Sequence, residues 1–96
     1  MEVEYHPLVR QDILEAARKY HDVSPRLAGE FSREIKAEIA KAAENPLRFR
    51  AAERGFRQAN LKRFPYHFLY DVRPSSIRVM IVRHHKRHPD LGLDRT

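Results

Sequence analysis

The spacing of the hydrophobic residues changes once along this chain, and the change limits the folds that it can adopt. Before residue 45, apolar residues recur every four positions, at Leu27, Phe31, Ile35, Ile39 and Ala43. After residue 65 they recur at every second position, at Tyr66, Phe68, Tyr70 and Val72. The first spacing is that of one helix face, and the second is that of one strand face. Helices followed by strands are typical of an α+β fold.

Capping residues and prolines predict where the helices begin and end. Ser24 precedes Pro25, which is the order of an N-cap residue and a first helical residue. Asn45 precedes Pro46, and a residue before proline is disfavoured in helical geometry, so this helix is expected to end there. An earlier helix is expected from about residue 7 to residue 20.

The expected order of elements is strand, helix, helix, strand, strand, strand (β-α-α-β-β-β). Their expected ranges are 3–5, 7–20, 24–44, 57–62, 66–72 and 77–84, with an exposed loop over 47–55. We expect the two helices to form a hairpin on one face of a mainly antiparallel sheet. Because single domains commonly contain ~100–150 residues, all 96 residues are expected to form one domain, 1–96.

Apolar positions on these elements define the expected core. It consists of Val9, Ile13, Leu27, Phe31, Ile35, Ile39, Phe68, Tyr70, Val79 and Ile81. The aromatic residues at 66, 68 and 70 have the spacing that could also stack nucleobases. Packing against the helix hairpin is the interpretation we favour for them.

Charge is divided unevenly between the two halves of the chain. Residues 1–47 contain seven Lys/Arg and nine Asp/Glu, whereas residues 48–96 contain twelve and four, so the second half supplies the net charge of +6. Such a field attracts polyanions and acidic protein segments. The chain has no cysteine, no apolar run long enough for a transmembrane helix and no signal-peptide pattern. These features predict a cytoplasmic protein with an anionic partner and no membrane association.

The basic half contains two groups of candidate site residues. Candidate contacts for a target or partner are Arg57, Lys62, Arg63 and Arg83. Candidate catalytic residues are His85, Lys86 and Arg87, which combine a histidine that could donate a proton with two cations that could hold a phosphate. A further candidate is His67, for which packing on the sheet is the competing interpretation.

Other kinds of chemistry are not supported by the sequence. Adjacent His84 and His85 face opposite sides of a strand and cannot easily bind one metal ion, so neither a metal nor a cofactor is expected. Glu53 and Asp71 are the only acidic residues between positions 45 and 89, and neither has an acidic neighbour. The sequence therefore offers no pair of carboxylates for acid–base catalysis.

The ordered set of motifs in the second half resembles the RelE/ParE superfamily of toxins from type II toxin–antitoxin (plasmid stabilisation) systems. The residues that carry the resemblance are Arg57, the run 63–70 (Arg-Phe-Pro-Tyr-His-Phe-Leu-Tyr), the strand 77–82 and the run 85–89 (His-Lys-Arg-His-Pro). It extends from about Val3 to Arg95. The resemblance implies the β-α-α-β-β-β fold, a toxic activity and a cognate antitoxin that forms a complex with the toxin.

The superfamily contains two activities, and the residues must be compared with both. RelE-like members cleave mRNA on the ribosome with a set of basic residues and a tyrosine. Here Gln58 and Asn60 occupy the lysine-bearing strand, His67 lies where an arginine often lies, and no tyrosine follows Arg87. The cleavage set is therefore incomplete, and the resemblance favours a ParE-like, non-catalytic inhibitor of DNA gyrase.

Two alternatives remain open at this point: a ribosome-dependent endoribonuclease, and a small basic nucleic-acid-binding module without toxicity. Whether the toxin inhibits gyrase or cleaves mRNA, Arg57 and residues 85–87 are expected to form one anion-facing surface at one end of the sheet. The antitoxin is expected to wrap the two helices and this basic end with an acidic segment that folds on binding.

Overall fold

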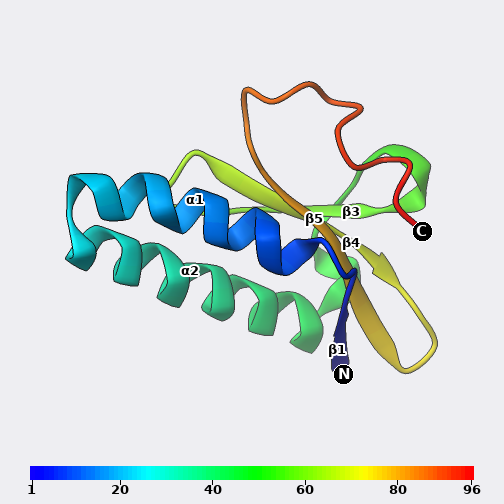
Figure 1. Cartoon of the computed structure of the whole chain (residues 1–96). Helices are drawn as coiled ribbons and strands as arrows, with labels where there is room; N and C mark the ends of the chain where they lie inside the picture. The colour runs from blue at the N-terminus through cyan, green and yellow to red at the C-terminus, as the bar shows by residue number, and fades with distance from the viewer.

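The structure, a computed structural model, describes residues 1–96 and places two helices against one face of a five-stranded sheet (Figure 1). The chain runs β1 (Glu2–Tyr5), α1 (Val9–Val23), α2 (Pro25–Glu44), β2 (Arg50–Ala51), β3 (Arg57–Asn60), β4 (Tyr66–Val72) and β5 (Ser76–His84). The C-terminal segment, orange to red in Figure 1, returns over the sheet on the side away from the helices. The predicted α+β fold is confirmed.

The ends of α2 follow the capping signals in the sequence. The Ser24 hydroxyl accepts a hydrogen bond from the Leu27 amide at 3.1 Å, and Pro25 occupies the first turn. The helix ends at Glu44, directly before Asn45 and Pro46. Helix α1 continues to Val23, three residues beyond its predicted end, because Ser24 both ends α1 and caps α2. Neither helix has the length and apolar character needed to cross a membrane.

The sheet has the strand order β1-β5-β4-β3-β2. Strand β1 pairs in parallel with β5, and every other pair is antiparallel. The sheet is therefore mixed, with the predicted antiparallel character in four of its five strands. Residues 47–55, predicted as a loop, contain two 3₁₀ turns (η1, Pro46–Arg48; η2, Glu53–Gly55) and the short edge strand β2.

A bulge in β5 divides the strand's apolar residues between the two sheet faces. Leu69 lies opposite Ile81, whereas the next residue, Tyr70, lies opposite Val79, so Met80 is the additional residue. As a result Val79 and Val82 both join the core under the helices, whereas Met80 and Ile81 point to the other face. The predicted core residue Ile81 is buried, but on the sheet face away from the helices, because an unbroken alternation does not anticipate a bulge.

The remaining predicted core residues pack between the helices and the sheet, with Ile13 and Leu27 only partly buried. Phe31 has no exposed surface and its ring contacts those of Phe64 and Tyr66 at centroid distances of 5.3 and 5.2 Å. Tyr66, Phe68 and Tyr70 all lie on the helix side and are at most 6% exposed. They are core residues and cannot stack nucleobases on the surface.

Candidate functional site

The sheet face opposite the helices is only partly covered. Leu93 of the C-terminal segment packs with Phe56, Leu69, Met80 and Ile81 over one part of it. Beside this cluster lies a polar hollow of about 370 Å³ with no hydrophobic lining residue. The residues that line this polar hollow are Arg50, Glu53, Gln58, Asn60, His67, Arg83, His85 and Pro89.

Strand register brings the polar side chains of the hollow together. Asn60 of β3 lies opposite His67 of β4, which lies opposite Arg83 of β5. Residues directly opposite one another in an antiparallel pair share a face, so these three form a row across the sheet. Arg50 and Gln58 are likewise paired and lie on the same face. The hollow therefore combines side chains from four strands, from the η2 turn (Glu53) and from the segment after β5 (His85 and Pro89).

Two histidines and an arginine form a hydrogen-bonded chain in the hollow. Arg83 Nε donates to His67 Nε2 at 2.9 Å, and His67 Nδ1 lies 2.8 Å from His85 Nδ1. A guanidinium only donates hydrogen bonds, so His67 must carry its proton on Nδ1 and donate it to His85. Neutral His85 then has its own proton on Nε2. Neither imidazole keeps a free lone pair to act as a base.

The environment keeps His67 uncharged. His67 is only 5% exposed, and its ring is nearly parallel to that of His85 and meets it edge to edge through the two Nδ1 atoms, with ring centroids 5.1 Å apart. Burial, followed by the positive charge of Arg83, lowers the pKa of His67 from 6.5 to about 4. At neutral pH the His67 ring is therefore uncharged. It holds its place through hydrogen bonds and cannot serve as a general acid.

Arg83 is buried and holds part of the backbone in place. It is 6% exposed, and its Nη1 donates to the carbonyl oxygens of Pro89 and Leu91 at 2.8 and 2.7 Å. These bonds hold the C-terminal segment against β5. Arg83 was predicted to contact a target or antitoxin. In the structure its Nε and Nη1 donors form hydrogen bonds inside the chain, and the predicted contact stays a prediction.

Arg57 lies apart from the hollow. It is opposite Tyr70, on the helix side of the sheet, and its Nη1 donates to the carbonyl oxygens of Leu47 and Phe49 at 3.3 and 2.8 Å. Strand β3 pairs with β4 and not with β5. The predicted single surface of Arg57 and residues 85–87 is therefore wrong, because it required these two strands to be neighbours.

The other two predicted contacts lie in the connection between β3 and β4. Lys62 and Arg63 are exposed, but the backbone amides of both donate to the Glu34 carboxylate, at 2.6 and 3.1 Å. The Arg63 guanidinium pairs with Glu30 at 2.7 Å. Arg63 thus attaches this connection to α2, whereas the Lys62 ammonium remains available for a partner.

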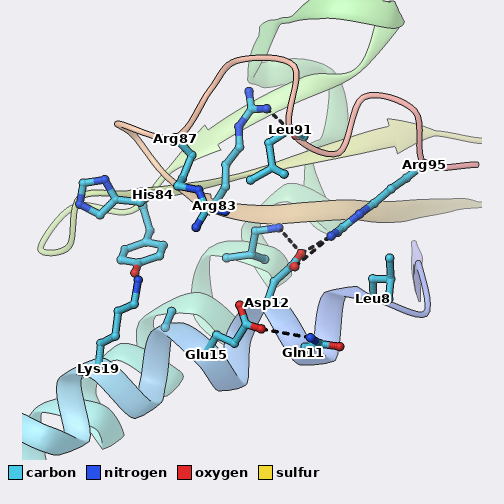
Figure 2. A pocket seen from close by; sticks show the side chains of 13 residues that line it. Leu8, Gln11, Asp12, Glu15, Lys19, Arg83, His84, Arg87, Leu91 and Arg95 are labelled. Atoms are coloured by element: carbon cyan, nitrogen blue, oxygen red, sulfur yellow. Dashed lines mark hydrogen bonds and ion pairs between the residues drawn. The ribbon is translucent and has the colours of Figure 1, made fainter.

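The three predicted catalytic residues diverge after β5. His85 lines the polar hollow, whereas Arg87 lines a different cavity between β5 and α1. Figure 2 shows the Arg87 side chain on the α1 side, close to His84. Lys86 is exposed on the turn between them and lines neither space. The structure therefore does not assemble His85, Lys86 and Arg87 around one reacting group.

Sequence reasoning missed several residues of the hollow. Arg50 and Glu53 were placed in a featureless loop, although the structure brings both to the hollow beside His67. Gln58 and Asn60 were noted only as departures from a lysine pattern. Their spacing of two would have placed both on one strand face, but only the pairing of β3 with β4 shows which face that is.

Comparison with known proteins relates this arrangement to one family. The family model for the ParE toxin of type II toxin–antitoxin systems, parDE, matches residues 3–89. The chain belongs to the ParE toxin family. The predicted resemblance is therefore confirmed, and the predicted role as a toxin of a type II system with a cognate antitoxin is correct.

Among solved structures, the ParE fold of this chain is similar to one described as the chromosomal ParDE system from P. aeruginosa. The TM-score is 0.77 and the sequence identity 18%, over 88% of this chain and 95% of that one. A comparison with curated protein sequences gave no match. The residues of the polar hollow all lie within the stretch that matches the family model, whereas residues 90–96 lie beyond it.

Proposed function

We propose that this ParE toxin inhibits DNA gyrase without cleaving nucleic acid. The observation that carries the proposal is the separation of His85 from Arg87, which line different spaces on opposite sides of β5. Cleavage of RNA requires a base near the ribose hydroxyl, a cation at the phosphate and an acid at the leaving oxygen. Here those groups do not converge.

The state of the histidines supports the same conclusion. Both lone pairs of the His67–His85 pair are engaged in hydrogen bonds, so neither ring can accept a proton without breaking the chain to Arg83. Glu53 is the only carboxylate that lines the hollow, and no second one lies beside it to act as an acid. The hollow can bind polar groups, but it lacks the paired groups of an acid–base catalyst.

A direct test compares both activities of the purified toxin. We expect inhibition of DNA supercoiling by gyrase, and no cutting of mRNA on translating ribosomes. In cells, regulated expression should cause filamentation and DNA-damage induction. His85→Ala and Glu53→Gln should each retain most of the inhibition, since neither is assigned to catalysis. Ribosome-positioned mRNA cuts that disappear in His85→Ala would instead establish the endonuclease.

The antitoxin is proposed to cover the groove between the two helices. A cavity of about 550 Å³ there is lined mainly by apolar side chains, among them Ile13, Leu14 and Ile39. Leu14 is 50% exposed, and Arg10 and Lys36 also line the groove. An amphipathic segment with apolar anchors and acidic flanks complements this surface. The groove is distant from the polar hollow, which lies on the other face of the sheet.

The groove assignment can be tested with two leucines of similar exposure. Leu14→Asp should weaken antitoxin binding by at least about tenfold, because a charge is buried against apolar side chains. Leu47, 66% exposed and outside the groove, provides the control in Leu47→Asp. Equal losses for the two variants, measured by calorimetry, would show that the antitoxin does not occupy the groove.

A further inference from the structure

A second polar cavity, of about 210 Å³, lies between α1 and β5 on the helix side of the sheet (Figure 2). The polar hollow lies on the opposite face of the sheet, and Arg83 is the one residue that lines both spaces. Glu15 and Lys19 enter it from α1, and Tyr66, His84 and Arg87 enter it from the sheet and from the turn after β5. We call it the α1–β5 cavity.

The acidic side chains of this cavity already have partners. Asp12 accepts two hydrogen bonds from the Arg95 guanidinium, at 2.6 and 3.0 Å, and one from the Val82 amide at 3.0 Å. Figure 2 shows Arg95 reaching Asp12 from the C-terminal segment. Glu15 accepts a hydrogen bond from Gln11 at 3.0 Å. Neither carboxylate forms an ion pair with Lys19 or Arg87.

The cationic and hydroxyl groups of the cavity have no partner. No side-chain hydrogen bond or ion pair within the protein involves Lys19 or Arg87, so the two positive charges face the cavity without a direct partner. The Tyr66 ring is buried, but its hydroxyl forms no hydrogen bond within the protein and is open to the cavity, since no buried side-chain polar atom lacks a partner. The hydroxyl is therefore free to donate to a ligand in the cavity. Burial, followed by positive neighbours that include Lys19 and Arg87, lowers the pKa of His84.

We propose that the α1–β5 cavity binds the phosphate group of a small molecule, held by Arg87, Lys19 and the Tyr66 hydroxyl. A guanidinium and an ammonium are the usual donors to phosphate oxygens, and a tyrosine hydroxyl adds a neutral donor. The cavity has room for one tetrahedral oxyanion with some water, and it is recessed between a helix and a strand. A small ligand therefore fits it better than the backbone of a DNA duplex.

Glu15 gives the site a distinctive response to substitution. Its carboxylate lies in the same cavity as the cations and would repel a phosphate. Glu15→Gln should therefore tighten binding, whereas Arg87→Gln and Lys19→Gln should each weaken it about tenfold, as expected for the loss of a charge-assisted hydrogen bond. Tyr66→Phe, which keeps the ring and removes only the hydroxyl, should weaken binding several-fold.

The test is titration of the folded toxin with inorganic phosphate, with chloride at equal ionic strength as the reference. The matched control is Arg18→Gln, which removes an exposed cation next to Lys19 outside the cavity and should leave the affinity unchanged. If Arg18→Gln weakens binding as much as Lys19→Gln, the attraction is diffuse and the site is refuted. Phosphate that binds no better than chloride also refutes it.

A second arm separates a small phosphate from a DNA backbone. Duplex DNA at the same concentration of phosphate groups should not displace inorganic phosphate from the recessed cavity. Displacement by DNA that depends on Arg87 would overturn the assignment to a small ligand. The measurement is independent of toxicity, so it stands or fails separately from the proposal of gyrase inhibition.

Discussion

At the scale of single residues, the chain of Arg83, His67 and His85 shows how neighbours determine chemistry. All three are basic residues in the sequence, yet one is buried against carbonyl oxygens and another is held neutral. The feature responsible is the cross-strand register that places His67 opposite Arg83. Only His85 remains exposed to a partner, through its Nε2 proton.

His67 should make the stability of the fold depend on pH. Its pKa is about 4 in the folded chain and 6.5 in the unfolded one, so between these values the unfolded chain binds more protons. Stability from this group is complete above pH 6.5 and is lost as the pH falls towards 4. The loss should reach ~2–3 kcal/mol in the free energy of unfolding between pH 7 and 4.5.

Urea denaturation at the two pH values measures this effect. His67→Gln should remove that part of the pH dependence, whereas His21→Gln, at an exposed position on α1, should retain it. An unchanged pH dependence in His67→Gln would show that His67 is not held neutral in the fold.

At the scale of secondary-structure elements, the C-terminal segment is fixed by two arginines of β5 and by its own Arg95. Arg83 holds the carbonyl oxygens of residues 89 and 91, Arg95 holds Asp12 of α1, and Arg78 donates to the Thr96 carbonyl at 2.7 Å. Leu93 adds the apolar contact. This segment closes one side of the polar hollow and one side of the α1–β5 cavity, and so shapes both.

Gly92 is the position at which this segment is least tolerant of change. Its φ is +85°, and a Cβ atom would overlap the side chain of Ile81. Gly92→Ala should therefore destabilise the protein by ~1–3 kcal/mol through backbone strain and overpacking. Gly29→Ala in α2 should instead be neutral or stabilising by up to ~1 kcal/mol, because alanine favours the helix and its Cβ meets only the end of Arg33. Chemical denaturation distinguishes the two, and equal effects would contradict the close contact.

Phe31 tests the packing of the helix hairpin on the sheet. Its ring lies among those of Tyr20, Phe64 and Tyr66. Phe31→Ala should lower the free energy of unfolding by ~3–5 kcal/mol, from lost burial and the cavity left behind. A shift below ~1 kcal/mol in denaturation would show that this ring does not organise the core.

At the scale of the whole molecule, the apolar groove and the polar hollow lie on different sides. The apolar groove lies on the helices, whereas the polar hollow lies on the far sheet face. An antitoxin that covers both must follow the molecule around an edge. That geometry favours an extended, flexible segment over a compact partner.

Antitoxin binding should therefore weaken with salt. The net charge of +6 attracts acidic residues of the antitoxin over distances that salt shortens, from about 10 Å at 0.1 M to about 3 Å at 1 M. The apolar contacts in the groove should persist, so affinity is expected to fall to a plateau and not to vanish. Calorimetry across that range measures this, and an affinity that salt leaves unchanged would exclude the electrostatic component.

The sequence by itself determined the elements, because spacing, caps and prolines act over a few residues. Helix α2, β4 and most of the core followed from periodicity, and the family followed from the ordered motifs around residues 57–89. The candidate site was predicted only in part. His85 and His67 were identified, but their contact was not.

Tertiary structure decided which of the basic residues act together. Arg57 and His85 are both basic residues at strand ends in the sequence. The strand order β1-β5-β4-β3-β2 separates their strands, and the pairing of Arg57 with Tyr70 places Arg57 on the helix side. The bulge at Met80 similarly moved Ile81 across the sheet. Lys19 and Arg87, far apart in the chain, share a cavity because α1 packs along β5. Which distant segments pair depends on the packing of the whole core, so short stretches of sequence carry no signal for it. For this reason the residues that share a site could be identified only from the tertiary structure.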